Sequence, residues 1–144
     1  RDAFFILESS LKYHGINVTF NITEDTIIHG YKNEYSQVIL NILSNAKDIL
    51  IERKIQNPKI DIEIKNGNNY ALVKIKDNAG GVDKSIIDKI FEPYFTTRHQ
   101  TQGTGIGLYM SKNIIERNMH GYINVRNEEN GALFTVKVDK EMEA

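Results

Sequence analysis

The spacing of apolar residues along the chain predicts alternating helices and strands. Residues 1–13 carry apolar positions at helical spacing, and residues 17–22 alternate between polar and apolar side chains as a half-buried strand does. The strongest helical pattern runs from Glu34 to about Ile55, with an apolar face and an opposite polar face. The dipeptide Asn57-Pro58 predicts the end of that helix.

Two alternating segments follow that helix. Residues 60–64 and 70–76 flank Asn66-Gly67, a dipeptide typical of a tight hairpin turn, and we expect them to pair as antiparallel strands. The remaining predicted elements are a short edge strand at 26–28, a helix at 83–90, a mobile loop at 96–107, a helix at 108–118 that Gly121 terminates, and a last hairpin formed by 122–126 and 132–138.

These elements predict an α/β (α+β) two-layer sandwich. We expect a mixed, mostly antiparallel sheet of about five strands packed on about three helices, with a flexible loop at one edge. Hydrophobic residues make up 40 % of the 144 residues, enough to form a core, and the length suits one domain over residues 1–144. Because the chain starts at Arg1 rather than at a methionine, we expect it to be part of a longer protein.

Charge and cysteine content exclude several classes of function. The 18 Lys and Arg residues nearly balance the 19 Asp and Glu residues, which argues against a basic nucleic-acid-binding module. The absence of cysteine excludes disulfides, thiolate metal sites and a cysteine nucleophile. The sequence shows neither a long apolar run nor a signal-peptide pattern.

The polar face of the long predicted helix carries the first candidate chemistry. Asn41 and Asn45 stand one turn apart, and Asp48 lies in the same stripe. Asparagine is a poor helix former, so two in a helix interior call for an explanation. An amide side chain offers a carbonyl oxygen to a hard cation and N–H donors to phosphate. A solvated helix face would show the same spacing, and the pattern alone leaves both interpretations open.

A carboxylate followed by small residues is the second candidate. Asp77 ends a predicted strand and is followed by Asn78-Ala79-Gly80-Gly81. Small residues let a ligand ring approach the backbone, and a buried carboxylate accepts the proton of the adenine amine but repels the guanine carbonyl. An ordinary turn with a local hydrogen bond is the alternative.

A glycine-rich segment before a predicted helix is the third candidate. Gly103-Thr104-Gly105-Ile106-Gly107-Leu108 can present backbone N–H groups to an anion at the helix N-terminus. The segment matches neither a phosphate-binding P-loop nor the dinucleotide fingerprint. Arg98 and His99 precede it and can supply charge to a terminal phosphate, although a flexible linker with solvated side chains is equally compatible with the pattern.

Four segments in order give a specific resemblance. The chain resembles the catalytic and ATP-binding domain of bacterial two-component sensor histidine kinases over nearly its whole length. It is also similar to the wider ATPase superfamily of gyrase B, heat-shock chaperones, histidine kinases and MutL. The segments that carry the resemblance to the N, G1, F and G2 boxes are Asn41–Asn45, Asp77–Gly81, Phe91-Glu-Pro-Tyr-Phe-Thr-Thr97 and Gly103–Leu108.

The resemblance implies ATP and Mg²⁺ as cofactors and assigns a role to each motif. Asn45 would hold Mg²⁺ through its side-chain oxygen, Asn41 would support the metal and the phosphates, and Asp77 would bind the adenine amine. Residues 94–107 would form the ATP lid, anchored by Phe91 and Phe95. The implied catalytic residues are Asn41 and Asn45, and the implied ATP-binding residues are Asn41, Asn45, Asp48, Asp77, Gly81, Thr97, Arg98, Gly103, Thr104, Gly105, Ile106, Gly107 and Leu108.

Two positions depart from the usual family pattern. Ala79 replaces the first glycine of the Asp-x-Gly-x-Gly motif, a mild change that leaves Gly81 in place. Asp48 stands where many relatives carry a lysine, which argues against a helix-borne lysine on the phosphates.

Asn41 occupies the position of the glutamate that activates water in the ATPases of the superfamily, so we expect slow ATP hydrolysis.

The implied reaction moves the γ-phosphate of ATP to a histidine on a separate dimerisation domain. None of the four histidines of the chain lies in the family's acceptor motif, so we expect that domain to be absent from this chain. The implied partners are the chain's own dimerisation domain and a response regulator, with no nucleic acid and no direct membrane contact. The expected location is the cytoplasm, including the cytoplasmic part of a membrane-anchored sensor. An anti-sigma-factor-type serine kinase and a non-catalytic nucleotide-sensing module are the alternatives.

Overall fold

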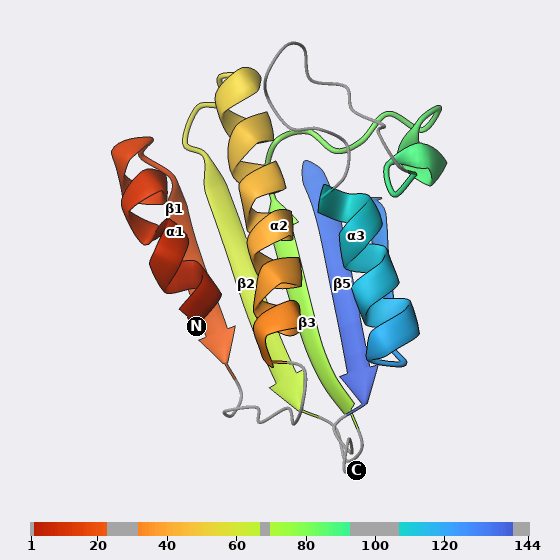
Figure 1. Ribbon diagram of the computed structural model, residues 1–144. Coiled ribbons are helices and arrows are strands. Elements are labelled where there is room, and N and C mark those ends of the chain that lie inside the picture. The colour runs from red at the N-terminus through yellow and green to blue at the C-terminus, as the bar shows by residue number, and fades with distance from the viewer. Residues whose placement is uncertain (1, 23–31, 67–69, 93–106, 140–144) are drawn as a thin grey trace.

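Three helical segments cover one face of a five-stranded sheet (Figure 1). The computed structural model describes residues 2–22, 32–66, 70–92 and 107–139. The strands are β1 (Asn17–Ile22), β2 (Lys59–Asn66), β3 (Tyr70–Asp77), β4 (Tyr122–Glu128) and β5 (Gly131–Asp139). The helices are α1 (Asp2–Tyr13), α2 (Lys32–Glu52) and α3 (Gly107–Asn113), which continues into the π turn η2 (Ile114–Asn118).

The sheet is mixed and mostly antiparallel, as the sequence predicts. Its strand order is β1-β2-β3-β5-β4. β1 pairs with β2 in parallel, and the other three pairings are antiparallel. α2 lies between α1 and α3 and packs against both (Figure 1). The two-layer sandwich is therefore confirmed, and α2 is the helix at its centre.

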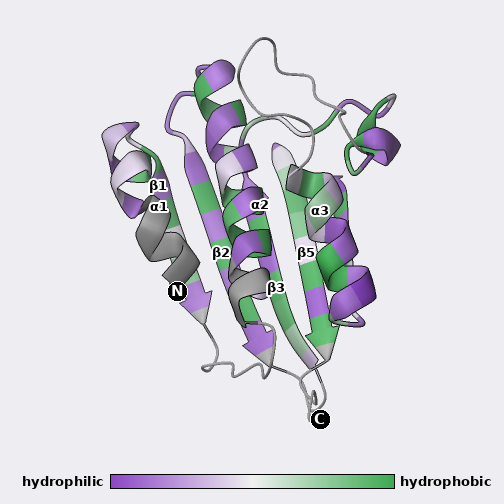
Figure 2. Ribbon diagram, viewed as in Figure 1, coloured by the Kyte–Doolittle hydropathy of each residue, from purple (hydrophilic) through white to green (hydrophobic). Residues whose placement is uncertain are grey.

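The hydrophobic core lies between the helices and the sheet. The strands alternate hydrophobic and hydrophilic residues, so that one face of the sheet can pack on the helices (Figure 2). The most deeply buried residues of α2 are Val38, Ile42, Leu43, Ala46 and Leu50. The facing residues of the sheet include Ile60, Ile62, Val73, Ile75, Phe134 and Val136.

The alternation of β3 determines where its terminal acid lies. Every second residue of this strand is buried, from Ala71 to Asp77. Asp77 therefore continues the core-facing series of the strand and is only 6 % exposed. The period of the strand thus places a carboxyl group at the edge of the core, beside α2.

The C-terminus of α2 lies three residues before the predicted end. Lys54 adopts a left-handed conformation with φ of 51°. The Lys54 N–H donates to the Ile51 carbonyl at 3.0 Å, and the Ile55 N–H donates to the Leu50 carbonyl at 3.2 Å. This pair of hydrogen bonds is the Schellman motif, which closes a helix and fixes the direction of its last residues. Arg53 consequently occupies a defined position at the end of α2.

The predicted helix at 83–90 is wrong. The structure forms only the short 3₁₀ helix η1 (Ile87–Lys89) there, after a turn. The Asp83 carboxylate accepts hydrogen bonds from the N–H and the hydroxyl of Ser85, both at 2.9 Å. The N–H groups of Ile86 and Ile87 donate to the Asp83 carbonyl at 3.0 and 3.1 Å, and the Lys89 N–H then donates to the Ile86 carbonyl at 2.8 Å, so a single turn is followed by a 3₁₀ bond instead of a continued α-helix. The predicted strand at 26–28 lies outside the described residues.

Candidate functional site

Asp77 is a buried carboxylate held by two backbone amides. Its Oδ1 accepts hydrogen bonds from the N–H groups of Ala79 at 2.9 Å and Ala132 at 3.3 Å. Burial raises the pKa of Asp77 above its ordinary value, while these two hydrogen bonds and then the charges of Arg53 and Lys76 act in the opposite direction. Both backbone bonds go to Oδ1, so these two amides fix Oδ1 and not Oδ2.

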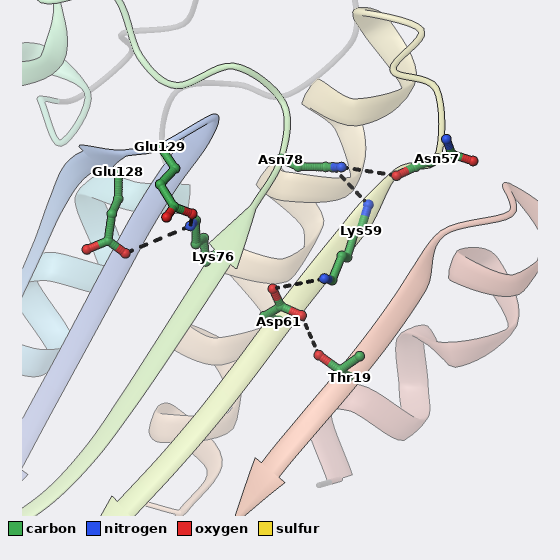
Figure 3. A network of polar contacts seen from close by, with 8 residues as sticks. All are labelled: Thr19, Asn57, Lys59, Asp61, Lys76, Asn78, Glu128 and Glu129. Atoms are coloured by element: carbon green, nitrogen blue, oxygen red, sulfur yellow. Dashed lines mark hydrogen bonds and ion pairs between the residues drawn. The ribbon is translucent and has the colours of Figure 1, made fainter.

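Asn78 ties the turn after β3 to the connection between α2 and β2 (Figure 3). Its Nδ2 donates to the Asn57 carbonyl at 3.0 Å, and its Oδ1 accepts the Lys59 backbone N–H at 2.9 Å. Both ends of the amide are therefore used, and the turn starts from a fixed point on the outer side of the sheet.

The charged residues on the outer face of the sheet pair with one another (Figure 3). Lys76 lies 2.8 Å from the carboxylate of Glu129 and 3.9 Å from that of Glu128. The hydrogen bond that Lys76 donates to Glu129 is the main cause that raises the pKa of Lys76. Asp61 accepts a hydrogen bond from Thr19 and lies 3.8 Å from the Lys59 ammonium. Lys76, next to Asp77 in sequence, is thus engaged on the opposite side of the sheet.

Glycines allow the turn 78–82 to pack against the β4–β5 hairpin. Gly80 and Gly81 adopt φ values of 103° and 88°, a region that disfavours residues with a Cβ atom. A Cβ on Gly131 would lie 1.6 Å from the Asp77 carbonyl oxygen, so only glycine fits at that point of the hairpin. This close approach also lets the neighbouring Ala132 N–H reach the Asp77 carboxylate.

Two side chains hold the turn from opposite sides. Nη1 of Arg53, at the end of α2, donates to the carbonyls of Ala79 at 2.8 Å and Gly81 at 2.9 Å. Asn127 of β4 accepts the Val82 N–H with Oδ1 and donates from Nδ2 to the Val82 carbonyl, both at 2.7 Å. Sequence reasoning missed both residues. The only available signal was an arginine directly after the asparagine-bearing helix, and no local pattern marked Asn127.

Asn41 joins α2 to the first turn of α3. Its Nδ2 donates to the Gly107 carbonyl at 3.2 Å and to Oγ of Ser111 at 3.0 Å, and its Oδ1 accepts from Gln37 at 2.9 Å. Ser111 is fully buried and also donates to the Gly107 carbonyl at 2.9 Å. Two segments predicted to act together, although 66 positions apart, are therefore in contact.

Asn45 and Asp48 lie on the same helix between Asn41 and Arg53, and both are half-buried. Asp48 lies 3.8 Å from the Lys47 ammonium, which also donates to Oγ of Ser10 at 3.2 Å. Lys47 thus connects α2 to α1, away from the glycine-rich end of α3. The oxygens of Asn41, Asn45 and Asp48 are hard donors of the kind that suits Mg²⁺.

Phe91 packs beside α3 and β5. Its ring meets Phe134 edge to face, with centroids 6.2 Å apart, and the Lys112 ammonium lies 5.5 Å from the centroid of the Phe91 ring. The chain at Phe91, just before residue 93, is therefore packed on the core. The predicted site residues Thr97, Arg98, Gly103, Thr104, Gly105 and Ile106, and the predicted anchor Phe95, lie outside the described residues.

The fold is an α/β sandwich in which α2 carries polar amides, a glycine begins α3, and a buried acid ends β3. Residues 30–142 match the family of histidine kinase-, DNA gyrase B-, and HSP90-like ATPases. The chain belongs to this family. As an ATPase domain it binds ATP, in agreement with the prediction from the four motifs.

The relatives of the chain include bacterial sensor kinases. The two-component sensor PprA of Pseudomonas aeruginosa is 32 % identical over 94 % of this chain, which spans only 15 % of the length of that relative. The nucleotide-free catalytic domain of the histidine kinase ThkA is 30 % identical, with a TM-score of 0.84 over 97 % of this chain and 89 % of that domain. The structure of ThkA with the response regulator TrrA matches with a TM-score of 0.78 and 26 % identity, over 97 % of this chain and 39 % of the matched one. The resemblance to sensor histidine kinases is confirmed.

Within the described ranges, no helix combines the length and the apolar character needed to cross a membrane.

Proposed function

We propose that this chain is the catalytic domain of a longer sensor histidine kinase and transfers the γ-phosphate of ATP to a histidine on a separate dimerisation domain. The observation that carries the proposal is the hydrogen bond from Asn41 to the Gly107 carbonyl. This contact brings the asparagine-bearing face of α2 to the end of the glycine-rich segment, where α3 begins. The N-terminus of α3 and the amides of α2 then form one surface for the phosphates.

Asp77 selects the base in this proposal. Its Oδ2 accepts a hydrogen bond from the exocyclic amine of adenine, whereas guanine would present a carbonyl oxygen to the same acceptor. Burial strengthens this selection because an unmatched polar group at the edge of the core has no water to replace the missing partner. The site therefore prefers ATP to GTP.

Residues that precede Arg53 on α2 would hold the phosphates and Mg²⁺. Asn45 holds the ion through its side-chain oxygen, with support from Asn41. Arg53, beside the turn that follows Asp77, comes eight residues after Asn45, about 12 Å along a helix axis at about 1.5 Å per residue. The base and the phosphates are thus served by different parts of one helix. Mg²⁺ supplies neutralisation of phosphate charge when it is bound.

The chain provides binding and orientation rather than a nucleophile. Asn41 is neutral and cannot activate water as a base, so hydrolysis is slow. The acceptor imidazole comes from the dimerisation domain; its nitrogen forms a bond to the γ-phosphorus as the bond to the oxygen of ADP breaks. His14 and His120, the two described histidines, are exposed residues that follow α1 and η2 and serve no such role.

The proposed partners follow from the proposed reaction. The dimerisation domain receives the phosphoryl group, and a response regulator then takes it from the phosphohistidine. The match to ThkA, whose structure contains the response regulator TrrA, supports a response regulator as a partner. We place the chain in the cytoplasm, where ATP and response regulators are found, within a longer sensor protein.

Phosphoryl transfer in two parts tests the proposal. The chain is incubated with Mg²⁺ and γ-labelled ATP, with and without a purified histidine-bearing dimerisation domain of a sensor kinase. We expect little label on the chain alone and label on the added domain that is lost in acid but kept in alkali, as phosphohistidine behaves. Replacing the acceptor histidine by alanine is the control and should abolish labelling.

Other outcomes favour the alternatives. Acid-stable label on a serine of a supplied protein would favour a serine kinase. Tight MgATP binding without transfer to any supplied histidine domain would favour a nucleotide-sensing module. Strong self-labelling of the chain would contradict an acceptor histidine on a separate domain. Rapid ATP hydrolysis by the chain would contradict the proposed kinase activity.

A further inference from the structure

The turn after β3 is restrained at successive peptide groups by residues far away in sequence. The Gly80 N–H donates to the Asn130 carbonyl at 2.7 Å. Arg53 binds the carbonyls on both sides of Gly80, and Asn127 pairs with both backbone groups of Val82. A turn with two glycines at positive φ has a large conformational entropy when it is free, so these contacts select one conformation from many.

Arg53 is placed by the way α2 ends. Its own N–H donates to the Ile49 carbonyl at 3.0 Å, and the next two residues complete the helix-closing motif. The backbone of Arg53 is consequently rigid, although its side chain is partly in water. Both contacts come from Nη1, whose two N–H groups reach the two carbonyls. A lysine side chain is one bond shorter, so from the same backbone position its ammonium falls short of them.

The restrained turn acts directly on the orientation of Asp77. The Ala79 N–H donates to Oδ1 of Asp77, and the Ala79 carbonyl accepts from Arg53. One residue therefore transmits the position of the arginine to the carboxylate. If the turn moves, the hydrogen bond that fixes Oδ1 weakens, and Oδ2 loses its defined direction.

We propose that Arg53 and Asn127 are positioning residues that clamp the turn 78–82 from its two sides and thereby set the preference of Asp77 for adenine. The inference rests on the proposed function, because it deepens the account of the same base site. Arg53 follows directly after α2, so the same helix links this clamp to the amides assigned to the phosphates. Neither residue touches the reacting atoms.

The first clamp is tested by calorimetric measurement of ATP and GTP affinities. The variants are Arg53→Met, Arg53→Lys and, as the control, Lys54→Met. Lys54→Met removes the same charge from the neighbouring exposed residue and leaves the carbonyl contacts intact. We expect Arg53→Met to weaken ATP binding by about tenfold, the effect of losing charged hydrogen bonds, and to reduce the ATP to GTP preference. Lys54→Met should match the wild type. Arg53→Lys should recover less than half of the lost preference.

Asn127→Asp tests the second clamp, with Asn124→Asp on the same strand as its control. The aspartate still accepts the Val82 N–H but cannot donate to the Val82 carbonyl, while Asn124→Asp adds the same charge at an exposed position. We expect a reduced ATP to GTP preference for Asn127→Asp only. Circular dichroism and thermal melting of every variant verify that it is folded at the temperature of the titration.

The outcomes separate this inference from the proposed function. If the wild type shows no preference for ATP over GTP, the proposed base site itself fails. If the wild type prefers ATP and the folded Arg53→Met and Asn127→Asp variants keep that preference, the clamp alone is overturned. Full recovery by Arg53→Lys would show that a positive charge suffices without the reach of Nη1, which also overturns positioning by Arg53.

Discussion

Replacing Asp77 by asparagine should reverse the base preference of the site. Two backbone N–H groups, from Ala79 and Ala132, point at Oδ1. In Asp77→Asn the amide oxygen must take that place, because the amide nitrogen would otherwise face two donors. The NH₂ group then occupies the position of Oδ2. It offers a donor to the adenine amine, which is also a donor, and a matching donor to the carbonyl of guanine.

The size of the effect follows from the bond that is lost. A hydrogen bond to a charged group contributes about 1.5–3 kcal/mol, so we expect ATP affinity to fall by about tenfold to 150-fold. GTP affinity should rise or stay constant, since a repulsion between acceptors is replaced by a hydrogen bond. The ratio of ATP to GTP affinity should therefore fall, and it is the most sensitive quantity.

Isothermal titration calorimetry with ATP and GTP measures this ratio for wild type, Asp77→Asn and the control Asp88→Asn. Asp88 is an exposed residue of η1, so its replacement changes the same charge without touching the base. The variant and control should both remain folded by circular dichroism. Equal loss of ATP and GTP affinity in Asp77→Asn, or unchanged ATP affinity, would refute the assignment of Asp77 to the base.

The pH dependence of ATP binding tests the role of Asp77 independently. Burial raises the pKa of Asp77, and ATP binding needs the ionised carboxylate. The ratio of wild-type to Asp77→Asn affinity for ATP should therefore fall as the pH drops through that raised pKa, with the titration of ATP cancelling in the ratio. The folding stability of the free protein depends on pH in the opposite direction. A raised folded pKa means that stability present at low pH is lost as the pH rises, so Asp77→Asn should be at least as stable as wild type at pH 7.

Three further changes test the packing around the site. Phe134→Ala removes a ring that is 2 % exposed and should lower the free energy of unfolding by about 3–5 kcal/mol in urea denaturation; a loss below 1 kcal/mol would contradict its central place. Gly131→Ala puts a methyl group 1.6 Å from the Asp77 carbonyl oxygen and should lower both the melting temperature and ATP affinity, whereas an unchanged melting temperature would show that the hairpin yields freely. Ser111→Ala removes two hydrogen bonds, one accepted from Asn41 and one donated to the Gly107 carbonyl, and should lower the free energy of unfolding by about 1–3 kcal/mol in the same urea assay; no loss would count against a structural link between α2 and α3.

The sheet was predictable because its strands have a simple period. The alternation at residues 17–22 and 70–76 predicted β1 and β3 almost to the residue, and the segments 122–126 and 132–138 predicted the hairpin of β4 and β5. The end of α2 was less predictable, since its left-handed residue is Lys54 rather than a glycine. The helical period at 108–118 likewise gave no warning of the π turn that begins at Ile114.

The candidate site was predictable where one element carries the signal. Asn41, Asn45 and Asp77 stood out because each residue is unusual for its helix or strand. The clamp on the turn was not predictable, because Arg53 reaches a carbonyl 28 positions away and Asn127 reaches a backbone group 45 positions away. The pairings of β3 with β5 and of β5 with β4, together with the closure of α2, bring these residues together.

A crystal structure of the chain with Mg²⁺ and a non-hydrolysable ATP analogue tests the central claim most directly. The account predicts that the adenine amine lies within hydrogen-bonding distance of Oδ2 of Asp77, that the ion is bound to the side-chain oxygen of Asn45, and that the phosphates lie between α2 and the start of α3. A nucleotide bound elsewhere, or an adenine amine without contact to Asp77, would contradict it.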